Sequence, residues 1–251
     1  MCNVKGALMQ PTALITGASF GIGRAIATAF AKKGCSLVIT CCHSPKELSI
    51  LSDSLRREFD IDILTSVGDI GDFDYTRQLF AEIDNRFGGL DILINNAGVS
   101  HIGLLHNMEI AEWNHIVNTN LTSVFSTCKL AIPHMLHQKQ GKIINISSVW
   151  GNVGASCEVA YSACKGGMNS FTKALAKELA PSNIQVNAIA CGVIDTRMNG
   201  CFTKDERQAL LEEIPAGRFG TPEEVATLAL QLSFGHPYLT GQIITLDGGW
   251  T

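Results

Sequence analysis

Short apolar runs alternate with helical segments along the whole chain. The apolar runs are rich in β-branched residues and lie at 12–16, 36–40, 61–67, 90–96, 141–147, 184–190 and 241–249. Helical segments are expected between them, at 23–34, 45–59, 72–87, 112–138 and 160–180. Strands of this kind, alternating with helices, are typical of a parallel sheet covered on both faces. The sequence therefore predicts an α/β fold: one doubly wound domain over residues 1–251, with a mostly parallel seven-stranded sheet and helices on both faces.

The composition favours a globular protein over a nucleic-acid-binding, secreted or membrane protein. With 251 residues, of which 46% are hydrophobic, the chain can bury a substantial core. The net charge of -4 and the lack of a basic run argue against a nucleic-acid partner. Lys5, Gln10 and Pro11 interrupt the N-terminal apolar segment, so we expect neither a signal peptide nor a membrane span. The cysteines are scattered without a C-x-x-C pair, which favours reduced thiols in a cytoplasmic protein, and no metal site is expected.

Glycines mark the turn between the first strand and the first helix. The segment TGASFGIG contains Gly17, Gly21 and Gly23, and Ser19, Phe20 and Ile22 lie between them. Glycine lets the backbone approach a diphosphate closely, and the N–H groups at a helix start attract its charge. The spacing differs from the general G-x-G-x-x-G pattern, so these glycines could instead serve only tight packing of strand and helix.

Further motifs follow in a fixed order. They are GDI (68–70) after the third strand, NNAG (95–98) after the fourth, Asn120 in the long helix, SSVWG after the fifth strand, YSACK, and GVIDT after the sixth strand. With this set the chain resembles the short-chain dehydrogenase/reductase family over nearly its whole length. The resemblance implies a Rossmann-type fold and an NAD(P)(H)-dependent oxidoreductase that transfers hydride between nicotinamide and a ketone or secondary alcohol.

The resemblance makes four residues a catalytic tetrad: Asn120, Ser148, Tyr161 and Lys165. Tyr161 and Lys165 are one helical turn apart, so they share a face of the predicted helix. An ammonium beside a tyrosine favours the phenolate and lowers a pKa that is ordinarily about 10. By resemblance, Ser148 hydrogen-bonds the substrate oxygen and Asn120 holds a water between the lysine and solvent. As a bare pair, the tyrosine and lysine would indicate only a surface contact of the helix.

The resemblance also implies further cofactor contacts. They are Asp69 and Ile70 at the adenine, the backbone of Asn95, Ala97 and Gly98 along the ribose and nicotinamide, and Ile194 and Thr196 at the carboxamide. Asp69 could equally cap a helix or shape a loop. The sixth-strand motif has Cys191 where the family usually has proline, which loosens the loop above the nicotinamide.

The end of the second strand indicates which nicotinamide is bound. Cys41 stands there, followed by Cys42, His43 and Ser44, and no carboxylate is present to bind a ribose 2′-hydroxyl. One observation argues against a 2′-phosphate: Phe20 stands where NADP enzymes often carry a basic residue. NADP(H) is favoured over NAD(H).

Substrate contacts are expected from loops at the carboxyl edge of the sheet. By resemblance, His101, Trp150 and Glu158 face the pocket. The segment 197–215 fits a substrate lid, and an ordinary surface helix explains it equally well.

Two groups within the family compete. PAGRFGTPEEVATLALQL and YLTGQIITLDGGW resemble bacterial 3-oxoacyl-acyl-carrier-protein reductases, which implies a ketone bound to acyl carrier protein. SSVWGNVGASCEVAYSACKGG resembles elongation factor P 5-aminopentanone reductases, which implies that Glu158 pairs with the substrate ammonium. A solvated charge on a loop is the more ordinary explanation of Glu158. The carrier-bound ketone is the leading hypothesis; another small ketone or hydroxysteroid, or a non-catalytic nucleotide-sensing protein, stays open. Relatives are commonly tetramers, so a homotetramer is expected.

Overall fold

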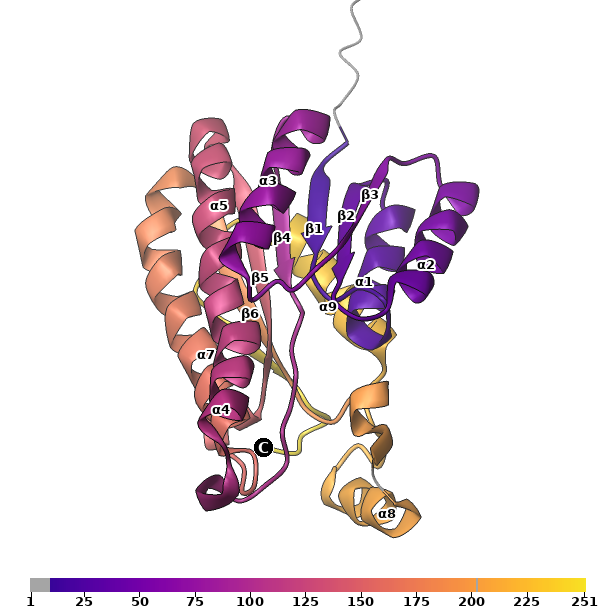
Figure 1. Cartoon of the computed structure of the whole chain (residues 1–251), viewed down its shortest axis with the longest axis vertical. Coiled ribbons are helices and arrows are strands. Elements are labelled where there is room, and N and C mark those ends of the chain that lie inside the picture. The colour runs from indigo at the N-terminus through magenta and orange to yellow at the C-terminus, as the bar shows by residue number, and fades with distance from the viewer. Residues whose placement is uncertain (1–9, 202) are drawn as a thin grey trace, which may run out of the picture.

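The strands form one parallel sheet. A computed structural model describes residues 10–201 and 203–251 (Figure 1). Within these residues, seven strands lie in the order β3-β2-β1-β4-β5-β6-β7 and every pairing is parallel. They are β1 (Thr12–Ile15), β2 (Ser36–Cys41), β3 (Ile63–Val67), β4 (Ile92–Asn95), β5 (Gly141–Ser148), β6 (Ile184–Cys191) and β7 (Ile243–Leu246). Strands β1, β2, β4 and β6 are buried along their full length, which explains their continuous apolar runs.

Helices cover both faces of this sheet (Figure 1). Helices α1, α2 and α9 share one core with Phe30, and α3, α5 and α7 share the other with Met135. The described helices are α1 (Gly21–Lys32), α2 (Pro45–Glu58), α3 (Phe73–Phe87), α4 (Ile110–Val117), α5 (Ser123–Gln138), α6 (Trp150–Val153), α7 (Val159–Leu179), α8 (Lys204–Glu213) and α9 (Pro222–Phe234). Short 3₁₀ turns lie at Leu105–Asn107, Ala180–Ser182 and Arg197–Cys201. The chain therefore has the expected Rossmann-type fold.

The chain changes direction across the sheet next to β1. The first strands run outward from β1 to β3, and the later strands continue on the other side from β4 to β7. The connections after β1 and β4 therefore leave neighbouring strands in opposite directions and open a crevice at the carboxyl edge, where such sheets bind ligands. In Figure 1 this edge lies at the bottom of the sheet, with α4 on one side and α8 on the other.

The expected long helix over 112–138 is interrupted. A π-helical turn over Asn118–Thr122 separates α4 from α5. A π turn contains one residue more than an α turn, so it re-aims the helix while the apolar pattern on either side continues. The periodicity of the sequence could not show this break, and the break contains Asn120.

Helix α9 lies outside the elements expected from the sequence, although its start carries a recognisable signal. The Thr221 hydroxyl accepts from the Glu224 N–H, and Glu224 Oε2 accepts from the Thr221 N–H at 2.8 Å. Pro222 occupies the first helical turn. This capping box followed by proline is typical of a helix N-terminus.

The cysteines whose side chains are described are free thiols, and most of them are buried. Burial raises the pKa of Cys128 and of Cys191 to about 12, so both thiols remain protonated at neutral pH. Among residues 10–201 and 203–251, no group of His, Cys, Asp or Glu side chains could hold a metal ion. In the same ranges, no helix is both long and apolar enough to cross a membrane.

Candidate active site

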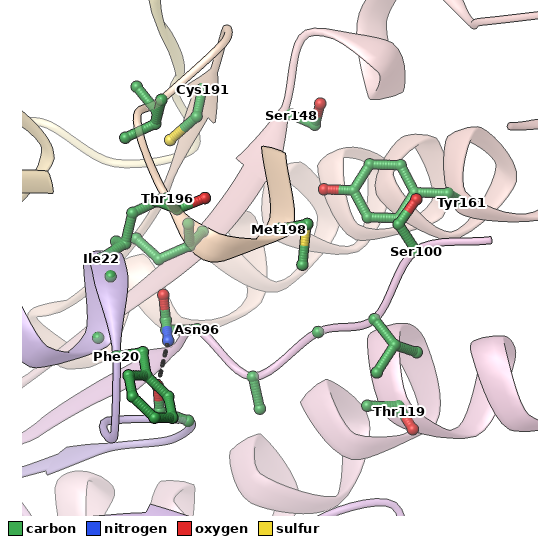
Figure 2. A pocket seen from close by; sticks show the side chains of 18 of the residues that line it. Phe20, Ile22, Asn96, Ser100, Thr119, Ser148, Tyr161, Cys191, Thr196 and Met198 are labelled. Atoms are coloured by element: carbon green, nitrogen blue, oxygen red, sulfur yellow. Dashed lines mark hydrogen bonds between the residues drawn. The ribbon is translucent and has the colours of Figure 1, made fainter. Parts of the chain in front are cut away.

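A cavity of about 790 Å³ opens at the carboxyl edge of the sheet (Figure 2). Its wall comes from the segments after β1 to β6, from α7 and from the C-terminal residues. The sequence-predicted residues on this wall are Gly17, Ser19, Phe20, Gly21, Ile22, Gly23, Cys42, His43, Ser44, Asp69, Ile70, Ala97, Gly98, Ser148, Trp150, Glu158, Tyr161, Lys165, Ile194 and Thr196. Three other predicted residues, Asn95, His101 and Asn120, lie off the wall.

The turn between β1 and α1 brings backbone close to the cavity. Gly17 and Gly21 have positive φ angles of 68° and 50°, a region that favours glycine. A side chain at Gly23 would collide with the Gly17 carbonyl oxygen. Helix α1 has no acidic residue in its first turn, and its N-cap residue Phe20 makes no side-chain cap. Because the first N–H groups of the helix are left for a ligand, the turn fits the diphosphate of a dinucleotide.

Thr16 and Asn96 hold this turn against the turn after β4. Asn96 Nδ2 donates to the carbonyl oxygens of Thr16 at 2.8 Å and of Gly17 at 3.0 Å. The backbone N–H groups of Asn96 and Ala97 donate to Thr16 Oγ1 at 3.0 and 2.9 Å. Figure 2 shows the Asn96 side chain directed at the glycine turn that carries Phe20 and Ile22. Sequence reasoning missed both residues; the second asparagine of NNAG was the available signal.

Asn95, for which a backbone contact with the cofactor is predicted, lies off the cavity wall. Its side chain lies in the core, where it donates to Asn145 Oδ1 at 2.9 Å and accepts from Thr127 Oγ1 at 2.7 Å. Successive residues of a strand face opposite sides, so Asn95 and Asn96 cannot both reach the cavity. The asparagine on the cavity wall is Asn96.

Tyr161 and Ser148 bring their hydroxyl groups together from different elements. Ser148 ends β5 and Tyr161 lies in the first turn of α7. Figure 2 shows the phenolic oxygen directed into the cavity, with Ser148 beside it. Burial raises the pKa of Tyr161, and Cys191 and Glu158 raise it further, while a hydrogen bond with Ser148 partly offsets the rise. The phenol is therefore held in its protonated form.

Lys165 lies one turn after Tyr161 and is 3% exposed. Its Nζ donates to the Ile146 carbonyl oxygen at 2.8 Å and lies 5.5 Å from the centroid of the Tyr161 ring. Burial lowers the pKa of this ammonium to about 8. Burial dominates the pKa of Tyr161, and the lowering expected from Lys165 stays a prediction.

Asn120 lies behind the cavity wall and is fully buried. Its Nδ2 donates to the carbonyl oxygens of Val99 at 2.8 Å and Ile116 at 3.0 Å, and its Oδ1 accepts from the Val99 N–H at 3.0 Å. A Cβ added to Gly98 would lie 2.7 Å from Asn120 Oδ1 and 3.8 Å from Lys165 Nζ, so these groups are close neighbours. The side chain thus fixes the segment after β4, and the water expected at Asn120 stays a prediction.

Glu158 brings a carboxylate to the cavity wall. Its Oε2 accepts from Ser100 Oγ at 2.7 Å, and both residues line the cavity. The Gly103 N–H donates to the Cys157 carbonyl oxygen at 2.8 Å, so the segment after β4 is joined at two points to the loop before α7. Cys157 has a φ of 63°, which is uncommon for a residue other than glycine. These contacts fix the position of the carboxylate.

An aromatic pair forms another part of the wall. The rings of Trp150 and Trp250 meet edge to face, with centroids 4.8 Å apart. Trp250 Nε1 donates to Glu213 Oε2 at the end of α8, at 3.3 Å. Sequence reasoning missed Trp250, because no local pattern indicates that the C-terminal residues return to the cavity.

His101 corrects another expectation. Its Nδ1 lies 3.6 Å from Glu112 Oε1 on α4, and its Nε2 lies near Gly103. The side chain therefore belongs to the contact between the loop after β4 and α4, outside the cavity wall.

The far end of the cavity is polar and exposed. Cys42 and His43 are exposed, and the Ser44 carbonyl oxygen accepts from Ser19 Oγ at 3.3 Å. Asp69 Oδ1 accepts from the Gly71 N–H at 2.8 Å, so this carboxylate shapes its own loop while it lines the cavity. This end has room for the adenosine part of a dinucleotide, next to the segment after β2.

Similar proteins are known. Residues 11–207 match the family described as short chain dehydrogenase. The uncharacterized oxidoreductase YmfI of Bacillus subtilis is 39% identical over 243 residues, covering 96% of this chain and 99% of that protein. The 3-oxoacyl-[acyl-carrier-protein] reductase FabG of Aquifex aeolicus is 38% identical, with 96% and 98% covered. The reductase of the same name from Staphylococcus aureus (strain Mu50) is 37% identical, with 96% and 98% covered.

Proposed function

This chain belongs to the short-chain dehydrogenase family, and from that membership we propose that it reduces the ketone of a 3-oxoacyl chain bound to acyl carrier protein, with NADPH. Membership makes it an NAD(P)-dependent oxidoreductase that acts on CH–OH groups and the corresponding ketones. One observation carries the proposal: the hydroxyls of Tyr161 and Ser148 and the buried amine of Lys165 meet at one cavity. The printed names of two relatives supply the substrate class.

In the proposed reaction Tyr161 donates its phenolic proton to the ketone oxygen. Its raised pKa keeps the hydroxyl protonated at neutral pH, as a proton donor requires. Ser148 Oγ accepts from the Trp150 N–H at 3.2 Å, and its own O–H, which lies beside Tyr161, would donate to the same ketone oxygen once the substrate is bound. The nicotinamide supplies the hydride when it is bound.

Lys165 and Asn120 act behind the proton donor. The Lys165 ammonium lies on the ring of Tyr161 and stabilises the phenolate that remains after proton transfer. Asn120 fixes both backbone groups of Val99, and so keeps the neighbouring Gly98 next to Lys165. In this proposal Asn120 is a positioning residue.

The segment from 197 to 215 acts as the substrate lid. Leu210 of α8 lines the cavity, and two exposed contacts attach α8 to the body of the protein. Arg207 pairs with Asp195 at 3.2 Å, and Glu213 accepts from Trp250. These exposed contacts can break and re-form cheaply, as lid movement requires.

A second substrate class is favoured by Glu158. Its carboxylate lies on the wall close to the reacting hydroxyl, where it would attract an ammonium group. A ketone that carries a primary amine, such as 5-aminopentanone on elongation factor P, suits this feature better than an acyl chain does.

The test is a substrate panel followed by the loss of NADPH absorbance. Acetoacetyl thioesters of acyl carrier protein, a neutral small ketone and 5-amino-2-pentanone are offered at equal concentration. The leading proposal expects the highest kcat/KM for the carrier thioester. If the aminoketone is preferred, and Glu158→Gln removes that preference without slowing the neutral ketone, the second class is correct. Lack of turnover with every ketone would contradict both.

We also propose a homotetramer built through α4, α5, α7 and β7. Phe125 on α5 and Val159 at the start of α7 are exposed apolar side chains. Strand β7 lies at the edge of the sheet, and Ile243, Ile244 and Leu246 are only partly buried there. Exposed apolar helices beside an unpaired edge strand are features that subunit contacts cover.

A further inference from the structure

The turn that would hold the cofactor diphosphate has no cation of its own. Phe20 precedes its second glycine, and no lysine or arginine occurs between Gly17 and Gly23. Arg24 follows on α1, but it is exposed and lies outside the cavity wall. A dinucleotide carries two negative charges on its diphosphate, and NADPH carries more on its 2′-phosphate, so a cation at this turn would strengthen binding.

Arg197 brings a cation to this turn from another part of the chain. Its guanidinium Cζ lies 4.3 Å from the centroid of the Phe20 ring, and both residues line the cavity. Such a distance is typical of a guanidinium stacked on an aromatic face. The preceding residue, Thr196, packs on the same turn, since a Cβ added to Gly21 would lie 3.1 Å from Thr196 Cγ2. The segment after β6 therefore rests against the glycine turn.

The charge of Arg197 is not used by a carboxylate in the described part of the chain. None of the ion pairs found within residues 10–201 and 203–251 includes it. The nearest acidic residue in sequence, Asp195, is engaged by both terminal nitrogens of Arg207 at 3.2 and 3.3 Å. Arg207 in turn lies 4.3 Å above the Phe219 ring, which holds it in that pair. Arg207 thus neutralises Asp195 and leaves Arg197 available to an anion.

We infer that Arg197 binds a phosphate group of the cofactor, with the Phe20 ring as the platform that orients its guanidinium. This inference rests on the proposed dinucleotide site. It differs from that proposal in placing the phosphate-binding cation on the lid segment after β6 instead of on the glycine turn. The role of Phe20 is then to stack on the Arg197 guanidinium and orient it toward the phosphate. Binding of the cofactor also attaches the first residue of the lid to the body of the protein.

The test measures cofactor binding directly. Trp150 and Trp250 line the cavity, so quenching of tryptophan fluorescence reports the dissociation constants of NADPH and NADH without any substrate. We expect Arg197→Gln to weaken NADPH binding about tenfold, the usual size of a lost hydrogen bond to a charged group. Arg197→Lys should recover part of the loss, and Phe20→Leu should cause a smaller loss in the same direction. Arg24→Gln changes an exposed arginine in the first turn of α1, off the cavity wall, and is the control that should change little.

The two nucleotides identify which phosphate is bound. A loss for NADPH alone assigns the guanidinium to the 2′-phosphate, and an equal loss for both assigns it to the diphosphate. Added salt should weaken NADPH binding to the wild type more steeply than to Arg197→Gln. Unchanged dissociation constants in Arg197→Gln, or an equal loss in Arg24→Gln, would overturn the inference. If the wild type binds neither nucleotide, the proposed function itself fails.

Discussion

Burial disfavours the charged form of both Tyr161 and Lys165. As a result, the pKa of the phenol rises and the pKa of the ammonium falls to about 8. At neutral pH the phenol therefore keeps the proton that it would donate, and the lysine, whose pKa of about 8 lies above neutral pH, is still largely protonated. An attractive charge pair of phenolate and ammonium becomes favourable only after that proton has left. This order suits reduction of a ketone.

The lowered pKa of Lys165 has a consequence for stability. Below about pH 8 the lysine is protonated in both the folded and the unfolded chain, so it does not make the free energy of unfolding depend on pH. Between about pH 8 and the ordinary value of 10.5, the unfolded chain keeps a proton that the folded chain has lost. The free energy of unfolding therefore rises with pH across this window, by up to about 1.4 kcal/mol per unit from this group.

The contribution of Lys165 to this pH dependence can be measured by urea unfolding. The wild type and Lys165→Met are compared at both ends of that pH window. The advantage of the wild type over the variant should grow as the pH rises. A difference that stays constant or shrinks would show that Lys165 keeps its proton in the folded chain.

Asn120 should matter for stability as well as for the site. Replacing it by alanine leaves the partly buried N–H and C=O groups of Val99 without their present partners. We expect Asn120→Ala to lower the free energy of unfolding by about 2 kcal/mol and to reduce kcat. Asn114→Ala, an exposed asparagine on α4, is the control for urea unfolding and should have little effect. Equal stabilities of the two variants would contradict the role given to Asn120.

At the scale of elements, the site is formed by loops that are held together by hydrogen bonds and a ring contact. Ser100 and Glu158 join the segment after β4 to the start of α7. Asn96 joins the same segment to the glycine turn. Trp250 joins the C-terminus to α6 through Trp150 and to α8 through Glu213. The rigid sheet positions these loops, and contacts between the loops set the shape of the cavity.

Trp250→Ala tests the last of these contacts. It removes the ring contact with Trp150 and the hydrogen bond to the lid helix, so the substrate end of the cavity should loosen. We expect KM for the ketone to rise about threefold to tenfold, with the NADPH dissociation constant nearly unchanged. Tyr238→Ala, which removes a fully exposed aromatic ring, should leave KM unaltered. An unchanged KM in Trp250→Ala would show that α8 closes without the C-terminus.

At the scale of the whole molecule, the order of the seven strands and of the helices between the first six of them followed from the sequence, because buried parallel strands and amphipathic helices have distinct patterns. Helix α9 and the break between α4 and α5 did not. The sheet edge that carries the site also followed, since the carboxyl ends of parallel strands meet there. The remaining features depend on contacts between distant segments. Arg197 on Phe20 and Trp250 on Trp150 have no local signature. Which of the two asparagines of NNAG has its side chain on the cavity wall depends on one residue of strand register, which composition does not fix.

The proposed tetramer predicts an effect of charge on its surface. Phe125→Glu places a carboxylate on the exposed face of α5, where the wild-type ring is 52% exposed. We expect this variant to elute as a smaller species in size-exclusion chromatography with light scattering, because a subunit contact would have to bury that charge. Ile50→Glu changes a side chain on α2 that is 60% exposed, outside the proposed contacts, and should keep the wild-type mass. A wild-type monomer, or two variants of wild-type mass, would contradict the assembly.

The central claim is that Tyr161 donates the proton in an NADPH-dependent ketone reduction. The most direct measurement compares the wild type with Tyr161→Phe, following kcat for a 3-oxoacyl thioester by NADPH absorbance and NADPH binding by tryptophan fluorescence. The account predicts that kcat falls about 10²- to 10⁴-fold while the dissociation constant for NADPH stays within about twofold of the wild-type value. A Tyr161→Phe enzyme that keeps more than about a tenth of the wild-type kcat would contradict it.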